Sequence, residues 1–389
     1  MTDSPDKFEI ETILTHGGRD PQQTRGTVNT PVYRASTVLF PTLDALQDYA
    51  LPFRYGRDGN PTLTSVEDTI TALEGAAGTV LAPSGVSAIS TAMLSVVNAG
   101  DDVLMTDSAY EPTRNFARDF LGRMGVAVRF YDPRIGGRIA DLIAPNTSLI
   151  MAESPGSLTF EVQDLPAIAR AAQARGARVA VDNTWATPLY YRPLSLGADL
   201  VIHAATKMFG GHSDVMFGTV SATAECFPAL KRTHRLLGVH VGPDDAFLVA
   251  RGLRTLAIRM AAHEERTLEI ARFLKTQPGV LNVLHPALPE HPDHAIFKRD
   301  FSGSGSLFSI VLEPRPRADL QRMVDTLRLF GMGYSWGGFE SLLLPIPTPT
   351  RTAVPWAEPG QLIRLQIGFE SLNDLKADLA DALARYRGA

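Results

Sequence analysis

The chain has 389 residues, 44% of them hydrophobic, so it can form two or three domains and bury a sizeable core. A net charge of -5 excludes the strongly basic surface typical of proteins that bind nucleic acid or anionic membranes. The single cysteine, Cys226, excludes an internal disulfide. The N-terminus lacks a signal-peptide pattern and no run of about 18 apolar residues occurs, so we expect a cytoplasmic protein without a membrane span.

Residues 1–60 are rich in threonine, proline, glycine and arginine and show little periodicity. They predict an extended N-terminal arm rather than a domain. A structureless segment of this length in a compact protein usually has a partner on which to lie. We therefore expect the arm to contact a neighbouring subunit.

Residues 61–253 alternate between helical and strand patterns, and we expect them to form the large domain. Such alternation predicts an α/β fold, with a mainly parallel sheet covered by helices on both faces. The predicted helices span 63–73 and 87–97, and the predicted strands span 79–81, 102–106, 148–152, 178–181 and 198–203.

Residues 254–389 predict a smaller C-terminal α+β domain. A final helix should follow Ser371, whose side chain would cap it together with Asp374 in a capping box. The other predicted elements of this domain are helices over 254–275 and 320–330 and strands over 306–312 and 362–367.

Polar motifs follow the predicted strands at their carboxyl ends, where parallel sheets bind their ligands. Lys207 follows the strand over 198–203, and Asp182 ends the strand over 178–181. Lysine and aspartate at neighbouring strand ends are what a pyridoxal phosphate enzyme requires: the lysine forms the Schiff base and the aspartate pairs with the protonated pyridine nitrogen. The two residues alone are also compatible with an ion pair at the rim of the sheet.

Three further positions fit the same cofactor. Gly85 and Val86 open a predicted helix directly after a strand, where free amides and the helix dipole suit a phosphate. Tyr110 follows another strand and could stack on the pyridine ring, with an ordinary interface tyrosine as the alternative.

Two arginines could bind the remaining anionic groups. Arg364, in a strand of the C-terminal domain, could hold a substrate carboxylate through two parallel hydrogen bonds, or simply form a salt bridge. Arg57 and the Tyr55 hydroxyl could donate to a phosphate, and their distance in sequence from the sheet suggests a phosphate on another subunit.

Seven motifs, in order and spanning nearly the whole chain, now identify a family. The sequence resembles the transsulfuration family of pyridoxal phosphate enzymes, which implies the fold type I architecture with a seven-stranded-type sheet. The matching segments are YGRDGNPT at 55–62, PSGVSAIS at 83–90, VDNTWATP at 181–188, ATKMFGGHSD at 205–214, GPDDAFLVARGLRTL at 242–256, SWGGFESL at 335–342 and IRLQIGFE at 363–370.

The resemblance implies a role for each candidate residue. Lys207 would hold the cofactor and move protons, and Tyr110 would stack on its ring and deprotonate the incoming amine. Asp182 would pair with the pyridinium, and Ser335 would help to hold the substrate carboxylate. The other implied contacts are to the phosphate, from Gly85, Val86 and Thr206 and from Tyr55 and Arg57 of a neighbouring subunit, and to the carboxylate, from Arg364. No metal ligand is assigned.

The segment around Ser335 bears on which reaction is catalysed. Tyr334 and Trp336 resemble cystathionine β-lyases, since γ-acting relatives commonly carry glutamate and leucine there. We therefore expect a carbon–sulfur lyase that cleaves L-cystathionine to homocysteine, pyruvate and ammonia in methionine synthesis, with related cysteine S-conjugates as further substrates. A γ-lyase and a non-catalytic regulator are the alternatives. Ala204, where the family often has serine, removes a phosphate donor. The resemblance also implies a homotetramer.

Overall fold

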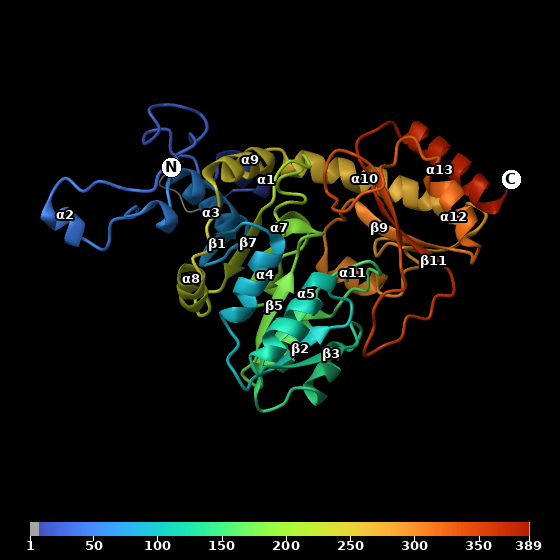
Figure 1. Cartoon of the computed structure of the whole chain (residues 1–389), viewed down its shortest axis with the longest axis horizontal. Coiled ribbons are helices and arrows are strands. Elements are labelled where there is room, and N and C mark those ends of the chain that lie inside the picture. The colour runs from blue at the N-terminus through green and yellow to red at the C-terminus, as the bar shows by residue number, and fades with distance from the viewer. Residues whose placement is uncertain (1–7, 389) are drawn as a thin grey trace.

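The computed structural model describes residues 8–388 and places the N-terminal segment at one end of an elongated molecule (Figure 1). Helix α1 (Ile10–His16) contacts α3 and α10, and its Leu14 is fully buried. From there to residue 60 the segment has little regular structure besides α2 (Leu43–Gln47) and one 3₁₀ turn, Gly56–Asp58. The part that carries α2 extends away from the body of the chain.

A seven-stranded sheet forms the centre of the large domain, in the order β1-β7-β6-β5-β4-β2-β3. Only β7 runs antiparallel to its neighbours, so the predicted mainly parallel sheet is confirmed. The strands β3 and β7 did not emerge from the sequence. The strands are β1 (Gly78–Ala82), β2 (Asp102–Thr106), β3 (Ala127–Tyr131), β4 (Thr147–Glu153), β5 (Arg178–Asp182), β6 (Leu200–His203) and β7 (Gly218–Ala222).

Helices cover both faces of this sheet because successive strand residues point to opposite sides. Leu104 packs on one face, with α6 (Leu165–Gln173). Val103 and Met105 pack on the other, with α4 (Gly85–Leu94) and α8 (Phe227–Leu236). The shorter helical segments are α5 (Glu111–Asn115), a π-helix over Phe116–Leu121, 3₁₀ turns over Gly136–Asp141 and Pro193–Leu196, and α7 (Thr187–Tyr190).

Helix α3 (Pro61–Glu74) joins the arm to the sheet, and its ends follow from its sequence. Asn60 caps it by accepting from the amides of Thr62 and Leu63, and proline occupies the first helical position. Gly75 ends it in the left-handed conformation, with φ of 64°. The helix predicted over 63–73 is therefore confirmed with slightly wider bounds.

The C-terminal part is built on a four-stranded antiparallel sheet in the order β10-β11-β9-β8, which confirms the expected smaller α+β unit. Its strands are β8 (Val280–Leu284), β9 (Leu307–Leu312), β10 (Leu342–Ile346) and β11 (Gln361–Gln366). The helices from the end of the large domain onward are α9 (Pro243–Leu253), α10 (Leu256–Lys275), α11 (His294–Asp300), α12 (Arg317–Val324) and α13 (Leu372–Arg387).

Some details of this part differ from the prediction. The helix expected from residue 254 begins at Leu256, and the predicted domain boundary falls between α9 and α10. The helix expected to reach residue 330 ends at Val324, because Asp378 of α13 accepts the amides of Arg328 and Leu329. The capping box at Ser371 was wrong, since its side chain makes no capping hydrogen bond. Over residues 8–388, no helix has the length and apolarity needed to cross a bilayer.

Candidate active site

Lys207 lies in the turn after β6, partly buried between the two domains. Its Nζ donates to Ser335 Oγ at 2.7 Å and lies 5.6 Å from the centre of the Trp336 ring. Burial and the nearby Arg364 charge lower the pKa of Lys207 to about 8, while Asp182 opposes this shift. A substantial share of the amine is therefore neutral near physiological pH, as a nucleophile or base requires.

Asp182 ends β5, on the strand that neighbours β6 in the sheet. It is 8% exposed, and its Oδ1 accepts from the amide and the hydroxyl of Thr184, at 3.0 and 2.5 Å. Burial raises the pKa of Asp182 despite these hydrogen bonds and the nearby positive charges. Such a carboxylate would be stabilised by a cation held against it, which is the role of a pyridinium nitrogen.

Thr184 and Glu153 were not assigned roles from the sequence. Thr184 also accepts from the amide of Ala204, so it links Asp182 to the turn that carries Lys207. Glu153 lies opposite Asp182 in the register of the parallel strands β4 and β5. Its carboxylate accepts a hydrogen bond from the Tyr110 amide at 2.7 Å. Burial and the Asp182 carboxylate raise the pKa of Glu153 well above its usual range. In the sequence, the position of Glu153 at the carboxyl end of a strand was the signal that could have assigned it to the site.

Tyr110 lies at the same edge of the sheet and is 44% exposed. Burial of its hydroxyl end, Glu153 and Asp182 raise its pKa, whereas Arg364 lowers it. The phenol therefore keeps its proton at neutral pH and is a hydrogen-bond donor. Removing a proton from an amine, the role that the family resemblance implies, would require more positive charge around it.

The N-terminus of α4 provides an anion site where the sequence places it. Ser84 caps the helix by accepting from the Ser87 amide, and the amides of Gly85 and Val86 are left free of recorded partners within residues 8–388. A Cβ added to Gly85 would lie 2.6 Å from the Ala204 Cβ, so only glycine lets the turn approach the Lys207 segment this closely. This combination of free amides, helix dipole and bare backbone suits a phosphate.

Thr206, the other predicted phosphate ligand, makes two hydrogen bonds within the chain. Its hydroxyl donates to the Phe217 carbonyl at 3.1 Å and accepts from the Phe217 amide at 2.8 Å. A hydroxyl has a single proton to donate, so a bond to phosphate would replace the one to the carbonyl. Its role in phosphate binding stays a prediction.

The segment over 335–337 packs directly on the lysine turn. Gly337 has φ of +86°, and a Cβ there would lie 3.0 Å from the Lys207 carbonyl carbon. Ser335 adopts a φ of 77°, which is uncommon for a residue with a side chain and typical of functional sites. Arg364 Nη2 donates to the Ser335 carbonyl at 3.0 Å, so the predicted carboxylate ligands Ser335 and Arg364 lie together.

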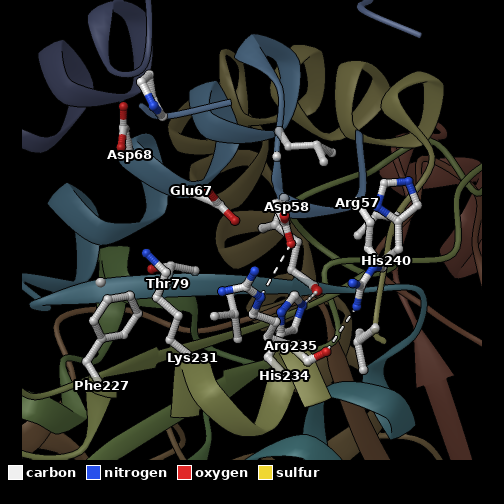
Figure 2. Close-up of a pocket in the computed structure, with 18 of the residues that line it drawn as sticks. Arg57, Asp58, Glu67, Asp68, Thr79, Phe227, Lys231, His234, Arg235 and His240 are labelled. Carbon is white, nitrogen blue, oxygen red and sulfur yellow. Dashed lines mark hydrogen bonds and ion pairs between the residues drawn. The ribbon is translucent and has the colours of Figure 1, made fainter. Parts of the chain in front are cut away.

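Tyr55 and Arg57 lie apart from this group, in or beside a pocket of about 460 Å³ whose lining includes none of the residues above. Figure 2 shows Arg57 and Asp58 in that pocket beside Arg235 of α8. Arg57 donates to the Arg235 carbonyl at 3.1 Å. Tyr334 is 89% exposed. The single chain therefore brings together Lys207, Asp182, Tyr110, Ser335, Trp336, Arg364 and the α4 N-terminus, but not the arm residues.

The fold and this arrangement define a class of protein. A partly neutral lysine, a buried carboxylate with a raised pKa, and a helix N-terminus with free amides match the aldehyde, ring nitrogen and phosphate of pyridoxal phosphate. The residues present fit the cofactor, and the protein is a pyridoxal phosphate-dependent enzyme.

The chain belongs to the Cys/Met metabolism PLP-dependent enzyme family, whose model matches residues 11–384. It is 48% identical over 379 residues to a putative cystathionine beta-lyase of Rhizobium johnstonii, covering 96% of both chains. It is 41% identical to cystathionine beta-lyase MetC of Escherichia coli, covering 97% of this chain and 98% of that one. A crystal structure of cystathionine gamma synthase from Xanthomonas oryzae pv. oryzae matches with a TM-score of 0.91, 33% identity and coverage of 98% and 99%.

The lowered pKa of Lys207 gives a first prediction. In cofactor-free protein, acylation of Lys207 by a small anhydride should reach half its maximal rate near pH 8, because only the neutral amine reacts. Arg364→Gln should move this midpoint upward, since it removes a positive charge that lowers the pKa. Peptide mass spectrometry of timed digests measures both, with the other lysine peptides as internal references. A midpoint near the ordinary 10.5 would contradict the description of this site.

A second prediction concerns the Ala204 side chain. Its Cβ faces the Gly85 turn, so the hydroxyl of Ala204→Ser would lie beside the proposed phosphate. A charge-assisted hydrogen bond should lower the dissociation constant for pyridoxal phosphate by about tenfold. Equilibrium dialysis with the cofactor measures this, and Ala205→Ser, at a buried position in the same turn, is the control. An unchanged constant would place the phosphate away from residue 204.

Proposed function

We propose that this protein is a cystathionine β-lyase, which cleaves L-cystathionine to L-homocysteine, pyruvate and ammonia and so supports methionine synthesis. The observation that carries the proposal is which side chains occupy positions 334 and 336 and where they lie. Trp336, rather than the leucine of γ-acting relatives, lies beside Lys207, with 5.6 Å between Nζ and the ring centre. Tyr334 stands where those relatives commonly carry glutamate and is 89% exposed. The β-lyase relatives support the same reading.

The proposed reaction uses groups that the site already orients. Bound pyridoxal phosphate supplies an electron sink for the negative charge that develops at the substrate Cα. Arg364 binds the α-carboxylate, and Asp182 provides the negative charge that a protonated ring nitrogen needs. Lys207 Nζ, oriented by Ser335 Oγ at 2.7 Å, takes the Cα proton.

The proton balance then follows. The Cβ–S bond breaks, its electron pair leaves with sulfur, and the proton held on Lys207 goes to the sulfur to give homocysteine. Water hydrolyses the three-carbon remainder to pyruvate and ammonia. Tyr110, which keeps its proton at neutral pH, donates a hydrogen bond within the site. This sequence needs no base acting on Cβ, whereas γ-elimination requires one.

The alternative is a γ-eliminating enzyme of the cystathionine γ-lyase or methionine γ-lyase type. The close structural match to a γ-synthase shows that the same fold serves γ-chemistry. Because Lys207 could remove a second proton, the backbone alone does not decide between the two reactions. A non-catalytic regulator is less consistent with a site that keeps Lys207, Asp182 and Arg364 together.

We also propose a homotetramer built from dimers with shared sites. Tyr55 and Arg57 lie between α2 and α3, and the pocket that Arg57 lines contains none of the residues around Lys207. From this position they would reach the phosphate on a neighbouring subunit. Apolar arm side chains such as Leu39 and Tyr49, which are 88% and 84% exposed, would be covered in the same assembly.

A substrate panel tests the proposed reaction. L-Cystine and L-djenkolate carry sulfur on Cβ only, whereas L-methionine carries it on Cγ. We expect the purified holoenzyme to release pyruvate from the first two and no 2-oxobutanoate from methionine. Lactate dehydrogenase coupling and mass spectrometry of the keto acids distinguish the products. Release of 2-oxobutanoate from methionine at a comparable rate would contradict the proposal.

A further inference from the structure

The connection between β10 and β11, residues 347–360, crosses from the small domain to the large domain. We call it the strap. It leaves the small-domain sheet after Ile346 and returns at Gln361, three residues before Arg364. Its Trp356 packs against an apolar cluster to which both domains contribute residues. The strap is therefore a direct link between the large domain and the strand that carries Arg364.

Asp107, directly after β2, anchors the strap on the large domain. It is 1% exposed, and its carboxylate accepts from three successive strap amides: Thr352 at 2.8 Å, Ala353 at 2.7 Å and Val354 at 3.1 Å. Arg114 Nη1 donates to Oδ1 at 2.9 Å. Although burial by itself raises the pKa of Asp107, these hydrogen bonds outweigh it, and the pKa is lowered. The carboxylate is therefore charged while it holds the strap.

Arg351 provides a second anchor. Its side chain is 6% exposed and pairs with Glu161 at 3.0 Å. It also donates to the Asp107 carbonyl and to the Thr159 hydroxyl. A buried arginine whose partners all lie on the large domain cannot move away with the small domain without leaving charges unpaired. The two anchors together hold the strap to one place on the large domain.

The anchored segment also carries Tyr110. Asp107 precedes it by three residues, and the Arg114 amide donates to the Tyr110 carbonyl at 3.1 Å. The Arg114 side chain donates both to Asp107 and to the Thr352 hydroxyl. Tyr110 and Arg364 lie close enough for the charge of each to shift the pKa of the other. The strap thus connects the segments that carry these two residues.

We propose that Asp107 is a positioning residue, which, through the strap, fixes Arg364 relative to Tyr110 and thereby sets how the substrate α-carboxylate is bound. The inference rests on the proposed role of Arg364 as the carboxylate ligand. It predicts that loosening the strap weakens the binding of amino acids while leaving the chemistry at Lys207 intact, because the anchoring hydrogen bonds of the strap go to Asp107, Thr159 and Glu161 rather than to Lys207.

The test compares Asp107→Asn with Asp293→Asn, a matched control. Asp293 is also buried, at 6% exposed, and it accepts from Arg134 at 2.8 Å and from the Val162 amide at 3.0 Å. It therefore makes the same kind of contact to the large domain, but with no strap residue. Arg351→Gln serves as a second test variant, which loosens the strap without altering the Asp107 carboxylate.

In the holoenzyme, Asp107→Asn and Arg351→Gln should raise KM for L-cystathionine and the dissociation constant for glycine, read from cofactor absorbance, by roughly tenfold. The value of kcat should stay within about threefold of the parent. Hydrogen exchange of the amides at 352–354 should quicken by at least about tenfold. Asp293→Asn should leave all four quantities close to the parent values.

Two results would overturn the inference. One is a faster exchange of the strap amides with no change in glycine binding, which would make the strap structural only. The other is an equal loss of glycine binding in Asp293→Asn, which would reflect general loosening of the domains. Absence of lyase activity in the parent enzyme would reject the proposed function instead, and the exchange and glycine measurements would still decide the role of Asp107.

Discussion

Replacing Lys207 by alanine should abolish turnover and the absorbance of covalently bound cofactor. In the proposed reaction, the Nζ of this residue both attaches the cofactor and moves the Cα proton, so the substitution removes two functions at once. Loss of a positioned general base with its covalent role should lower kcat by more than about ten-thousandfold. Steady-state keto-acid release and the absorbance spectrum of the reconstituted variant measure both effects.

A matched control for this variant is Lys231→Ala. Lys231 lines the separate pocket beside α8, which includes none of the residues around Lys207 (Figure 2). We expect it to retain near-parental absorbance and turnover. Retention of activity in Lys207→Ala, or equal loss in both variants, would refute the assigned role of Lys207.

Arg364→Ala should mainly impair the productive binding of substrate. The residue is partly buried, and its Nη2 already donates to the Ser335 carbonyl. Two charge-assisted hydrogen bonds to a carboxylate are each worth about 1.5 kcal/mol or more, so kcat/KM should fall by roughly a hundredfold or more. Most of the loss should appear in KM, because the carboxylate is bound in both the ground state and the transition state.

The exposed arginine of α12, Arg322, provides the control for this substitution. It is 53% exposed and pairs with Asp319 of the same helix, so Arg322→Ala should leave kcat/KM unchanged. Cofactor absorbance should be retained in both variants. An unchanged kcat/KM in Arg364→Ala would remove this residue from the site.

The sequence predicted the elements that its local pattern controls. The strand over 102–106 was predicted with its observed bounds, and α3 ends where Gly75 can adopt its left-handed conformation. It did not reveal β3, whose residues alternate between exposed and partly buried, or β7, whose small residues give little apolar signal. The end of α12 depends on Asp378, more than 50 residues away from Val324, and no local pattern reports such a contact.

In the site, too, the features that depend on local sequence were predicted and those that depend on distant contacts were not. Strand ends and motif order placed Lys207, Asp182, Tyr110 and the α4 N-terminus at one edge of the sheet. Contacts between distant parts of the chain were not accessible, and the hydrogen bonds from the strap to Asp107 span about 245 residues. The electrostatics also required the fold, because burial of Tyr110, which raises its pKa, is not visible in the sequence.

The products that the protein forms from L-cystathionine test the proposed β-elimination most directly. The single sulfur of cystathionine is bonded to Cβ of one half of the molecule and to Cγ of the other. The products therefore show which of these two bonds the purified holoenzyme breaks. We expect pyruvate and homocysteine in equal amounts, measured by mass spectrometry of the derivatised keto acids and thiols. Formation of 2-oxobutanoate and cysteine instead would contradict the interpretation of Tyr334 and Trp336, and the protein would then be a γ-eliminating member of the same family.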